Sequence, residues 1–141
     1  MGMYWPIGYL IRDVCSKSMS ISKMKLTLTR SYLAAPCYIT ICYVNSTPEV
    51  ITRDQTKFSI TTGEYIVQTN CDQTKEEPDI LYSVKRRSLC SNVIGKNENN
   101  FLSVEDLVEK VLKYPVLNHE TVYYTIMVPG SDIHCSKVTF F

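Results

Sequence analysis

The stretch Gly63-Glu64-Tyr65-Ile66-Val67-Gln68-Thr69 is the part of the sequence on which we base the fold prediction, because an apolar run led by glycine is typical of a strand. An alternating segment at 79–87 and a weaker one at 90–94 predict two more strands. Residues 100–111 then predict a helix, with Ser103 as its N-cap and apolar residues at helical spacing. Strands followed by a capped helix indicate an α+β fold.

The remaining segments extend this pattern. Residues 8–23 contain a candidate amphipathic helix around Leu10 and Val14, although the serines that follow favour turns. Alternating or continuous apolar residues predict further strands at 24–28, 37–44, 58–60, 122–128 and 137–141. We therefore predict a single compact domain over 1–141. It has a mostly antiparallel sheet of five to seven strands, with one well-defined helix at about 104–113 packed on it.

Composition narrows the function classes. Hydrophobic residues make up 45% and charged residues 21% of the 141 residues, which is typical of a globular domain. The net charge of +1 gives no field that would attract nucleic acid or an anionic membrane. The longest apolar run, at 32–44, is shorter than the roughly 20 residues of a membrane span. We expect another protein as the partner, with no nucleic acid, no membrane and no cofactor.

The six cysteines leave the compartment open. At this length no disulfide is needed for stability, and no signal peptide is visible at the start, so reduced thiols in an intracellular (cytoplasmic) protein are favoured. The glycosylation sequon Asn45-Ser46-Thr47 keeps a secreted protein as an alternative.

The order of segments resembles that of an SH2 domain. Residues 63–67 resemble the start of the strand that carries the family's Gly-x-Phe-Leu-Val-Arg motif, and 101–108 resemble the start of its second helix. Ile51-Thr52-Arg53-Asp54-Gln55 corresponds to the start of the first helix. The resemblance implies a central antiparallel sheet between two helices, which binds phosphotyrosine peptides through an arginine. Gln68 stands at the arginine position, and a neutral amide does not make the charge-assisted bidentate contact with phosphate.

Three groups of residues are candidate sites. Lys85, Arg86 and Arg87 form a basic patch, for which a solvated strand end is the simpler interpretation. Tyr4 and Trp5 form an aromatic cluster that either anchors a partner or covers the core. His119 with Glu120, and Asp132, His134 and Cys135, have ligand residue types, but their spacing does not predict a metal site.

From these observations we predict a non-catalytic protein–protein interaction module, SH2-like with a disabled phosphotyrosine pocket, and not an enzyme. One alternative is a structural subunit of a larger assembly, such as a virus particle or a ribonucleoprotein. Another is a secreted effector stapled by disulfides. A small thiol hydrolase is a third, and it requires a cysteine activated by its surroundings.

Overall fold

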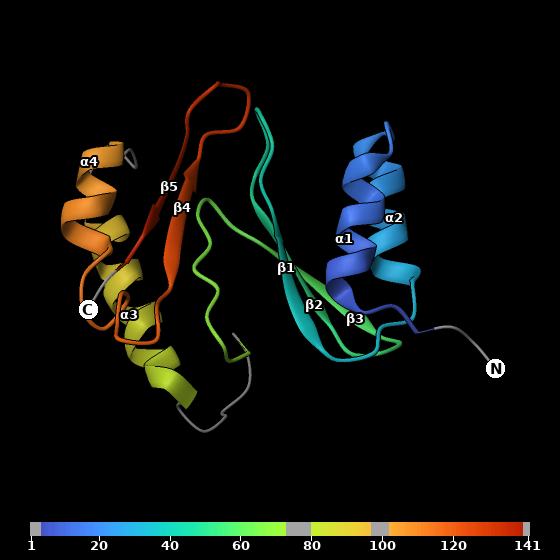
Figure 1. Cartoon of the computed structure of the whole chain (residues 1–141), viewed down its shortest axis with the longest axis horizontal. Coiled ribbons are helices and arrows are strands. Elements are labelled where there is room, and N and C mark those ends of the chain that lie inside the picture. Colours follow the sequence, from blue (N-terminus) through green and yellow to red (C-terminus); the bar gives the residue numbers. More distant parts are fainter. Residues whose placement is uncertain (1–3, 73–79, 97–101, 140–141) are drawn as a thin grey trace. The chain divides into compact units, whose positions relative to one another are not determined.

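The computed structural model describes residues 4–72, 80–96 and 102–139, and the chain divides into two compact units, Met1–Ile66 and Val67–Phe141. The first unit contains two helices and a three-stranded sheet, and the second contains the remaining helices and a two-stranded sheet (Figure 1). The prediction of one domain over 1–141 stays a prediction.

Helices α1 (Ile7–Ser16) and α2 (Ile21–Arg30) begin the first unit. In α1, Leu10 and Val14 are buried four residues apart, which is the spacing of one helical face. In α2, the side chain of Ser20 caps the N-terminus by accepting from the backbone N–H of Lys23. The amphipathic helix expected in 8–23 is therefore confirmed as α1.

The strand predicted at 24–28 is wrong, because these residues belong to α2. Its alternating threonines misled the prediction, since β-branched residues favour strands. In the helix, Thr27 and Thr29 donate their hydroxyls to the carbonyls of Lys23 and Lys25 four residues earlier, at 2.9 and 2.8 Å. Leu28 then faces the core at 2% exposure.

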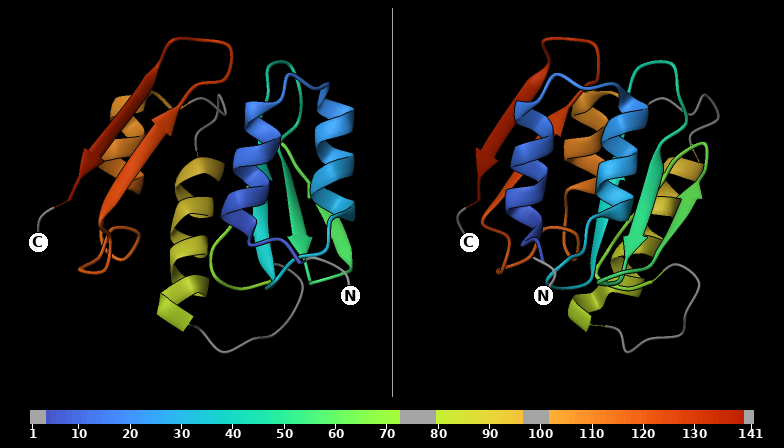
Figure 2. Two further views of the ribbon diagram at one scale, coloured as in Figure 1. Left: turned by 45° about the vertical axis from the view of Figure 1, so that its right-hand side comes forward. Right: turned by 90° about the vertical axis from the view of Figure 1, so that its right-hand side faces the viewer.

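The sheet of the first unit is an antiparallel meander of β1 (Cys37–Ile41), β2 (Glu49–Arg53) and β3 (Phe58–Thr62), with β2 in the centre. Its register pairs Ile39 with Ile51 and Ile51 with Ile60. Helices α1 and α2 lie against one face of this sheet (Figure 2). Burial of apolar residues between these layers makes the core, whose members are Leu10, Val14, Leu28, Leu33, Ile39, Ile41 and Ile51.

Two of these strands had been predicted and one had not. The structure confirms strands in 37–44 and 58–60, which are β1 and β3, the two edge strands of the sheet. Residues 51–53, proposed as the start of an SH2-type helix, lie instead in strand β2.

In the second unit, a tight turn labelled η1 (Ile80–Tyr82) leads into α3 (Ser83–Gly95), and α4 (Val104–Asp106) continues into η2 (Leu107–Val111). Ser103 caps α4 as predicted, since its Oγ accepts from the backbone N–H of Asp106 at 3.0 Å. The strands predicted within 79–87 and 90–94 are wrong where the structure describes them, because 83–95 form α3. The strand predicted at 63–69 is also absent, since none of these residues is in a strand.

Strands β4 (Tyr123–Met127) and β5 (His134–Val138) form an antiparallel hairpin in the second unit. They confirm the strand expected in 122–128 and shift the last one to 134–138. Among the described residues, no helix is both long enough and apolar enough to cross a bilayer.

The predicted fold class is therefore wrong. Among the described residues, the five strands form two separate sheets, of three and two strands. The longest helices there are α1, α2 and α3, and none of them is the well-defined helix predicted at about 104–113. The error came mainly from assigning strands to residues that are helical. The SH2 resemblance itself stays a prediction.

Candidate active site

A polar recess of the second unit lies where the segment before α3 meets the loop before β4. It has a volume of about 170 Å³ and is lined by Asn70, Leu81, Arg86, Val116, Asn118, Glu120 and Thr121. It therefore brings together one guanidinium, two side-chain amides and one carboxylate. A recess of this size is smaller than the roughly 300–1,000 Å³ of a drug-sized site, and it suits a polar group of a ligand.

Arg86 is fixed in this recess by three hydrogen bonds. Its Nε donates to the carbonyl oxygen of Leu81 at 2.9 Å, and its Nη2 donates to Asn70 Oδ1 at 2.6 Å and to Ser83 Oγ at 3.2 Å. Leu81 and Tyr82 adopt left-handed backbone angles, with φ of 53° and 56°, in the turn that leads into α3. The guanidinium is thus held in place by the turn before its own helix.

Asn70 receives its orientation from Arg86. Because Asn70 Oδ1 accepts from the guanidinium, the amide group Nδ2 is the free donor end of the side chain, and no hydrogen bond to a described residue uses it. Asn70 is exposed, so this donor is accessible to a ligand. The pair therefore presents a cation and an oriented N–H donor side by side.

Arg87, the next residue of α3, fastens the segment that carries Asn70. Its Nη2 donates to the carbonyl oxygen of Cys71 at 2.5 Å and lies 3.0 Å from Cys71 Sγ, while Nη1 donates to the carbonyl oxygen of Asp72 at 3.1 Å. Gln68 Nε2 donates to the carbonyl oxygens of Thr69 and Cys71, at 2.7 and 3.0 Å. These contacts hold residues 68–72 against α3.

The other wall of the recess is a turn built on Asn118. Its Oδ1 accepts from the backbone N–H of Glu120 at 2.9 Å, and its own backbone N–H donates to Thr121 Oγ1 at 3.1 Å. Side-chain hydrogen bonds of this type are typical of asparagine in turns. The turn leaves the Glu120 carboxylate exposed at the recess.

The thiols with shifted pKa values do not indicate an activated nucleophile. Burial raises the pKa of the Cys90 thiol, although the Arg86 guanidinium opposes this shift. Burial also raises the pKa of Cys37, against the opposing effect of Arg53. A raised pKa lowers the thiolate fraction, which is the reactive form. The structure pairs none of the six cysteines, all of which lie in the described residues.

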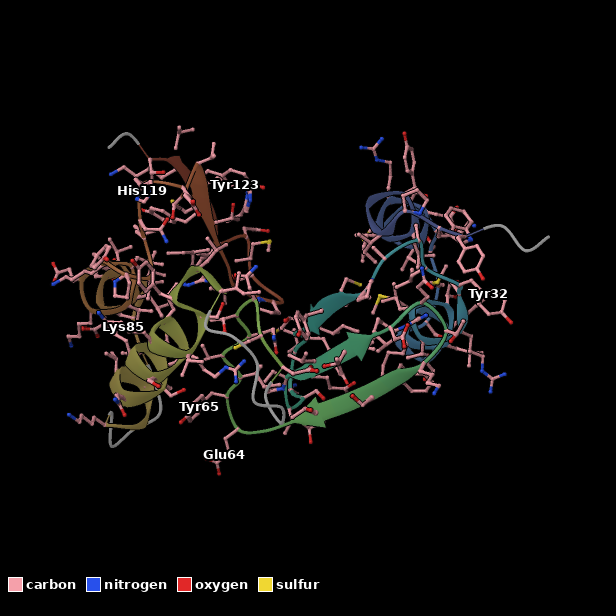
Figure 3. The ribbon with its side chains drawn as sticks, turned by 90° about the horizontal axis from the view of Figure 1, so that it is seen from below. Tyr32, Glu64, Tyr65, Lys85, His119 and Tyr123 are labelled. Carbon is pink, nitrogen blue, oxygen red and sulfur yellow. The ribbon has the colours of Figure 1, made fainter. Side chains whose placement is uncertain are left out.

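The predicted site residues are dispersed. Arg86 lines the recess, and Arg87 holds the segment that contains Gln68 and Asn70. The two arginines lie in α3 and Gln68 lies in a loop, so none of these predicted residues is on a strand. Lys85 is exposed on α3 and does not line the recess (Figure 3). Within the described residues, no group of three or more potential ligands is placed to hold a metal.

The remaining predicted residues lie in the first unit. Arg53 is buried, at 2% exposure, and donates to the carbonyl oxygens of Leu28 and Ser31 at the end of α2, which gives it a structural role. Tyr4 is half exposed and stacks at a tilt on Tyr32, with ring centroids 5.9 Å apart. Trp5 packs against the core.

Sequence reasoning missed Asn70, Asn118 and Thr121. Each is a polar residue in a loop, a class too common to mark a site. Asn70 becomes notable only because the fold brings it next to Arg86, 16 residues further along the chain.

Comparison with known proteins reveals relatives of a different kind from the one predicted. The chain is 33% identical to human acid ceramidase over 131 residues, which span 86% of this chain and 32% of that protein. It is 27% identical to mouse acid ceramidase over 129 residues, and 35% identical over 126 residues to the uncharacterized protein R632 of Acanthamoeba polyphaga mimivirus. The chain spans 39% of the viral protein, and about a third of the ceramidases. No family model matches it.

These relatives contradict the prediction of a non-catalytic, SH2-like binding module and of a protein that is not an enzyme. A ceramidase is a hydrolase, and the similarity extends over most of the chain. The alternatives of an assembly subunit and of a disulfide-stapled effector are set aside on the same finding. The intracellular location and the protein partner stay predictions.

Proposed function

We propose that this chain is part of a hydrolase that cleaves the amide bond of a ceramide-like lipid. The observation that carries the proposal is the similarity to acid ceramidases over 86% of the chain, at 33% identity in the human protein. In such a reaction water is added across the carbon–nitrogen bond, which yields a fatty acid and an amine. The chain spans about a third of the length of the ceramidases.

The polar recess is the part of the chain that suits amide hydrolysis. Attack on an amide carbonyl places negative charge on the carbonyl oxygen, and fixed N–H donors stabilise this oxyanion in the transition state. Asn70 Nδ2 and the Arg86 guanidinium are donors of this type, already held in position by their mutual hydrogen bond at 2.6 Å. We assign the oxyanion contact to Asn70, with Arg86 as the residue that orients it and adds positive charge.

The nucleophile is not assigned to this recess. Attack at neutral or acidic pH requires an activated group, and burial raises the pKa values of Cys37 and Cys90. The proposed role of Asn70 and Arg86 is therefore to bind the scissile amide and to stabilise the transition state.

A chimera tests this proposal directly. The matching third of human acid ceramidase is replaced by this chain, and hydrolysis of a fluorescent ceramide is measured. We expect the chimera to release fatty acid. Loss of a single oxyanion donor lowers kcat by roughly 10²–10³-fold. The kcat of the Asn70→Ala chimera should therefore be about 10²-fold lower than that of the parent chimera, with little change in KM.

The control variant is Asn92→Ala, which removes an exposed asparagine of α3 that does not line the recess. It should retain the activity of the parent chimera. A folded chimera that leaves ceramide intact, or an Asn70→Ala variant as active as Asn92→Ala, would refute the proposed function.

A further inference from the structure

We propose that the apolar pocket between η2 and the β4–β5 hairpin binds the alkyl chain of a fatty acid, with the carboxylate held by Lys137 of its lining. The pocket has a volume of about 370 Å³ and lies wholly in the second unit. The lining residues that carry the argument are Val108, Leu112, Leu117, Tyr124, Lys137 and Val138.

The lining is suited to a hydrocarbon chain. Four of these six side chains are aliphatic, and the volume falls within the range of roughly 300–1,000 Å³ that is typical of ligand sites. Apolar ligands gain affinity with each methylene group that they bury. A flexible alkyl chain can follow a pocket of this kind, whereas a polar ligand would find few hydrogen-bond partners along its walls.

Lys137 is the one charged residue in the lining of the pocket. In the hairpin it pairs with Tyr124, so both side chains project from the same face of the ladder, with Cβ atoms about 4.5–5.5 Å apart. Within the described ranges, no hydrogen bond or ion pair uses the Lys137 ammonium. An ammonium and a phenol hydroxyl in the same lining offer two donors to a carboxylate.

The choice of a fatty acid as the ligand rests on the proposed function. The positive charge of Lys137 then distinguishes between the two products of that reaction. Hydrolysis of a ceramide-like amide gives a fatty acid, which is an anion, and an amine, which is a cation. Lys137 attracts the first and repels the second. The pocket is therefore assigned to the acyl product and not to the amine.

Binding is tested on the chain itself with saturated carboxylates from octanoate to dodecanoate, below their micelle concentrations, by calorimetry. We expect the Kd to fall roughly fourfold for each added methylene until the pocket is filled. Val108→Phe, at a position that is 37% exposed, narrows the pocket and should stop this gain at a shorter chain.

The contribution of the charge is measured with Lys137→Met, which keeps an apolar stem. Dodecanoate should bind roughly two- to fivefold more weakly to this variant, and its advantage over dodecan-1-ol should disappear. Lys85→Met, which removes an exposed lysine outside the pocket, is the matched control and should leave both ligands unaffected.

The proposal is overturned by a chain that does not bind dodecanoate, by equal binding of dodecanoate and dodecan-1-ol to the unaltered chain, or by equal effects of the two lysine variants. This outcome is separable from the fate of the proposed function. An active chimera with no dodecanoate binding refutes the pocket alone, whereas dodecanoate binding by a chain whose chimera is inactive refutes the hydrolase alone.

Discussion

Arg53 is expected to stabilise the first unit rather than bind a ligand, and Arg53→Met tests this. The guanidinium is 2% exposed and donates to two carbonyl oxygens at the C-terminal end of α2, those of Leu28 and Ser31. Leu28 lies in the last turn of α2, where carbonyls lack partners within the helix, and Ser31 is the C-cap residue, so Arg53 satisfies carbonyls at the end of this helix. Burial lowers the pKa of Arg53, which is the sign of a desolvation cost.

The size of the effect follows from these contacts. Each hydrogen bond from a charged donor contributes about 1.5–3 kcal/mol, so two contribute about 3–6 kcal/mol. Removing the guanidinium also removes its desolvation cost, which offsets part of the loss, and we expect a net destabilisation of about 2–4 kcal/mol. With a urea m-value of about 1.5 kcal/mol/M, the midpoint should fall by roughly 1.3–2.7 M.

The assay is urea unfolding followed by tryptophan fluorescence. Trp5 is the only tryptophan of the chain and packs against the core of the first unit, so its signal reports on that unit. Arg30→Met is the control, since Arg30 is exposed on the last turn of α2. Equal midpoints for the Arg53 and Arg30 variants would refute the structural role of Arg53.

Two further predictions concern ion pairs. Lys25→Met should lower the urea midpoint of the first unit, because it leaves the buried Glu49 carboxylate without its ammonium partner at 2.6 Å. Adding Glu49→Leu should restore most of this loss, and no recovery would contradict the explanation. The hydrogen bond from Lys110 holds the pKa of Asp106 below its ordinary value of 3.8, so its contribution to stability is present above about pH 4 and lost as the pH falls through the folded pKa. Asp106→Asn should therefore lower the melting temperature at pH 7 but not at pH 2, and an equal loss at both pH values would contradict the assignment.

The parts of the fold that the sequence predicts correctly are those where local chemistry and burial agree. Strand β3 shows apolar alternation, and Ser103 is a typical N-cap with an acidic residue three positions later. Helix α2 was predicted wrongly, because its alternating threonines favour a strand locally. In the structure, the hydroxyls of Thr27 and Thr29 donate to carbonyls four residues earlier, which makes these residues compatible with a helix. Helix α3 fails for a related reason, since Val84, Ser88 and Val93 have no strong helical preference.

The sequence predicted only some residues of the candidate site. Arg86 and Arg87 stood out as a basic pair, but their partners are the Asn70 side chain and the carbonyls of Cys71 and Asp72, at least 15 residues away. No local pattern predicts that such residues meet. The proposal of a hydrolase rests on the relatives, since a polar loop residue has no periodicity or spacing that would mark a site.

In the proposed function, Arg86 orients Asn70 for the oxyanion of a lipid amide. A double-mutant cycle on kcat for ceramide hydrolysis by the chimera, with Asn70→Ala, Arg86→Met and the double variant, measures this coupling. Near-ultraviolet circular dichroism on each variant controls for folding. If Arg86 acts through Asn70, each single variant loses about 10²-fold and the double variant loses little more, because residues that act as a unit are not additive. Single effects that multiply to about 10⁴-fold, or single variants with unchanged kcat, would contradict the account.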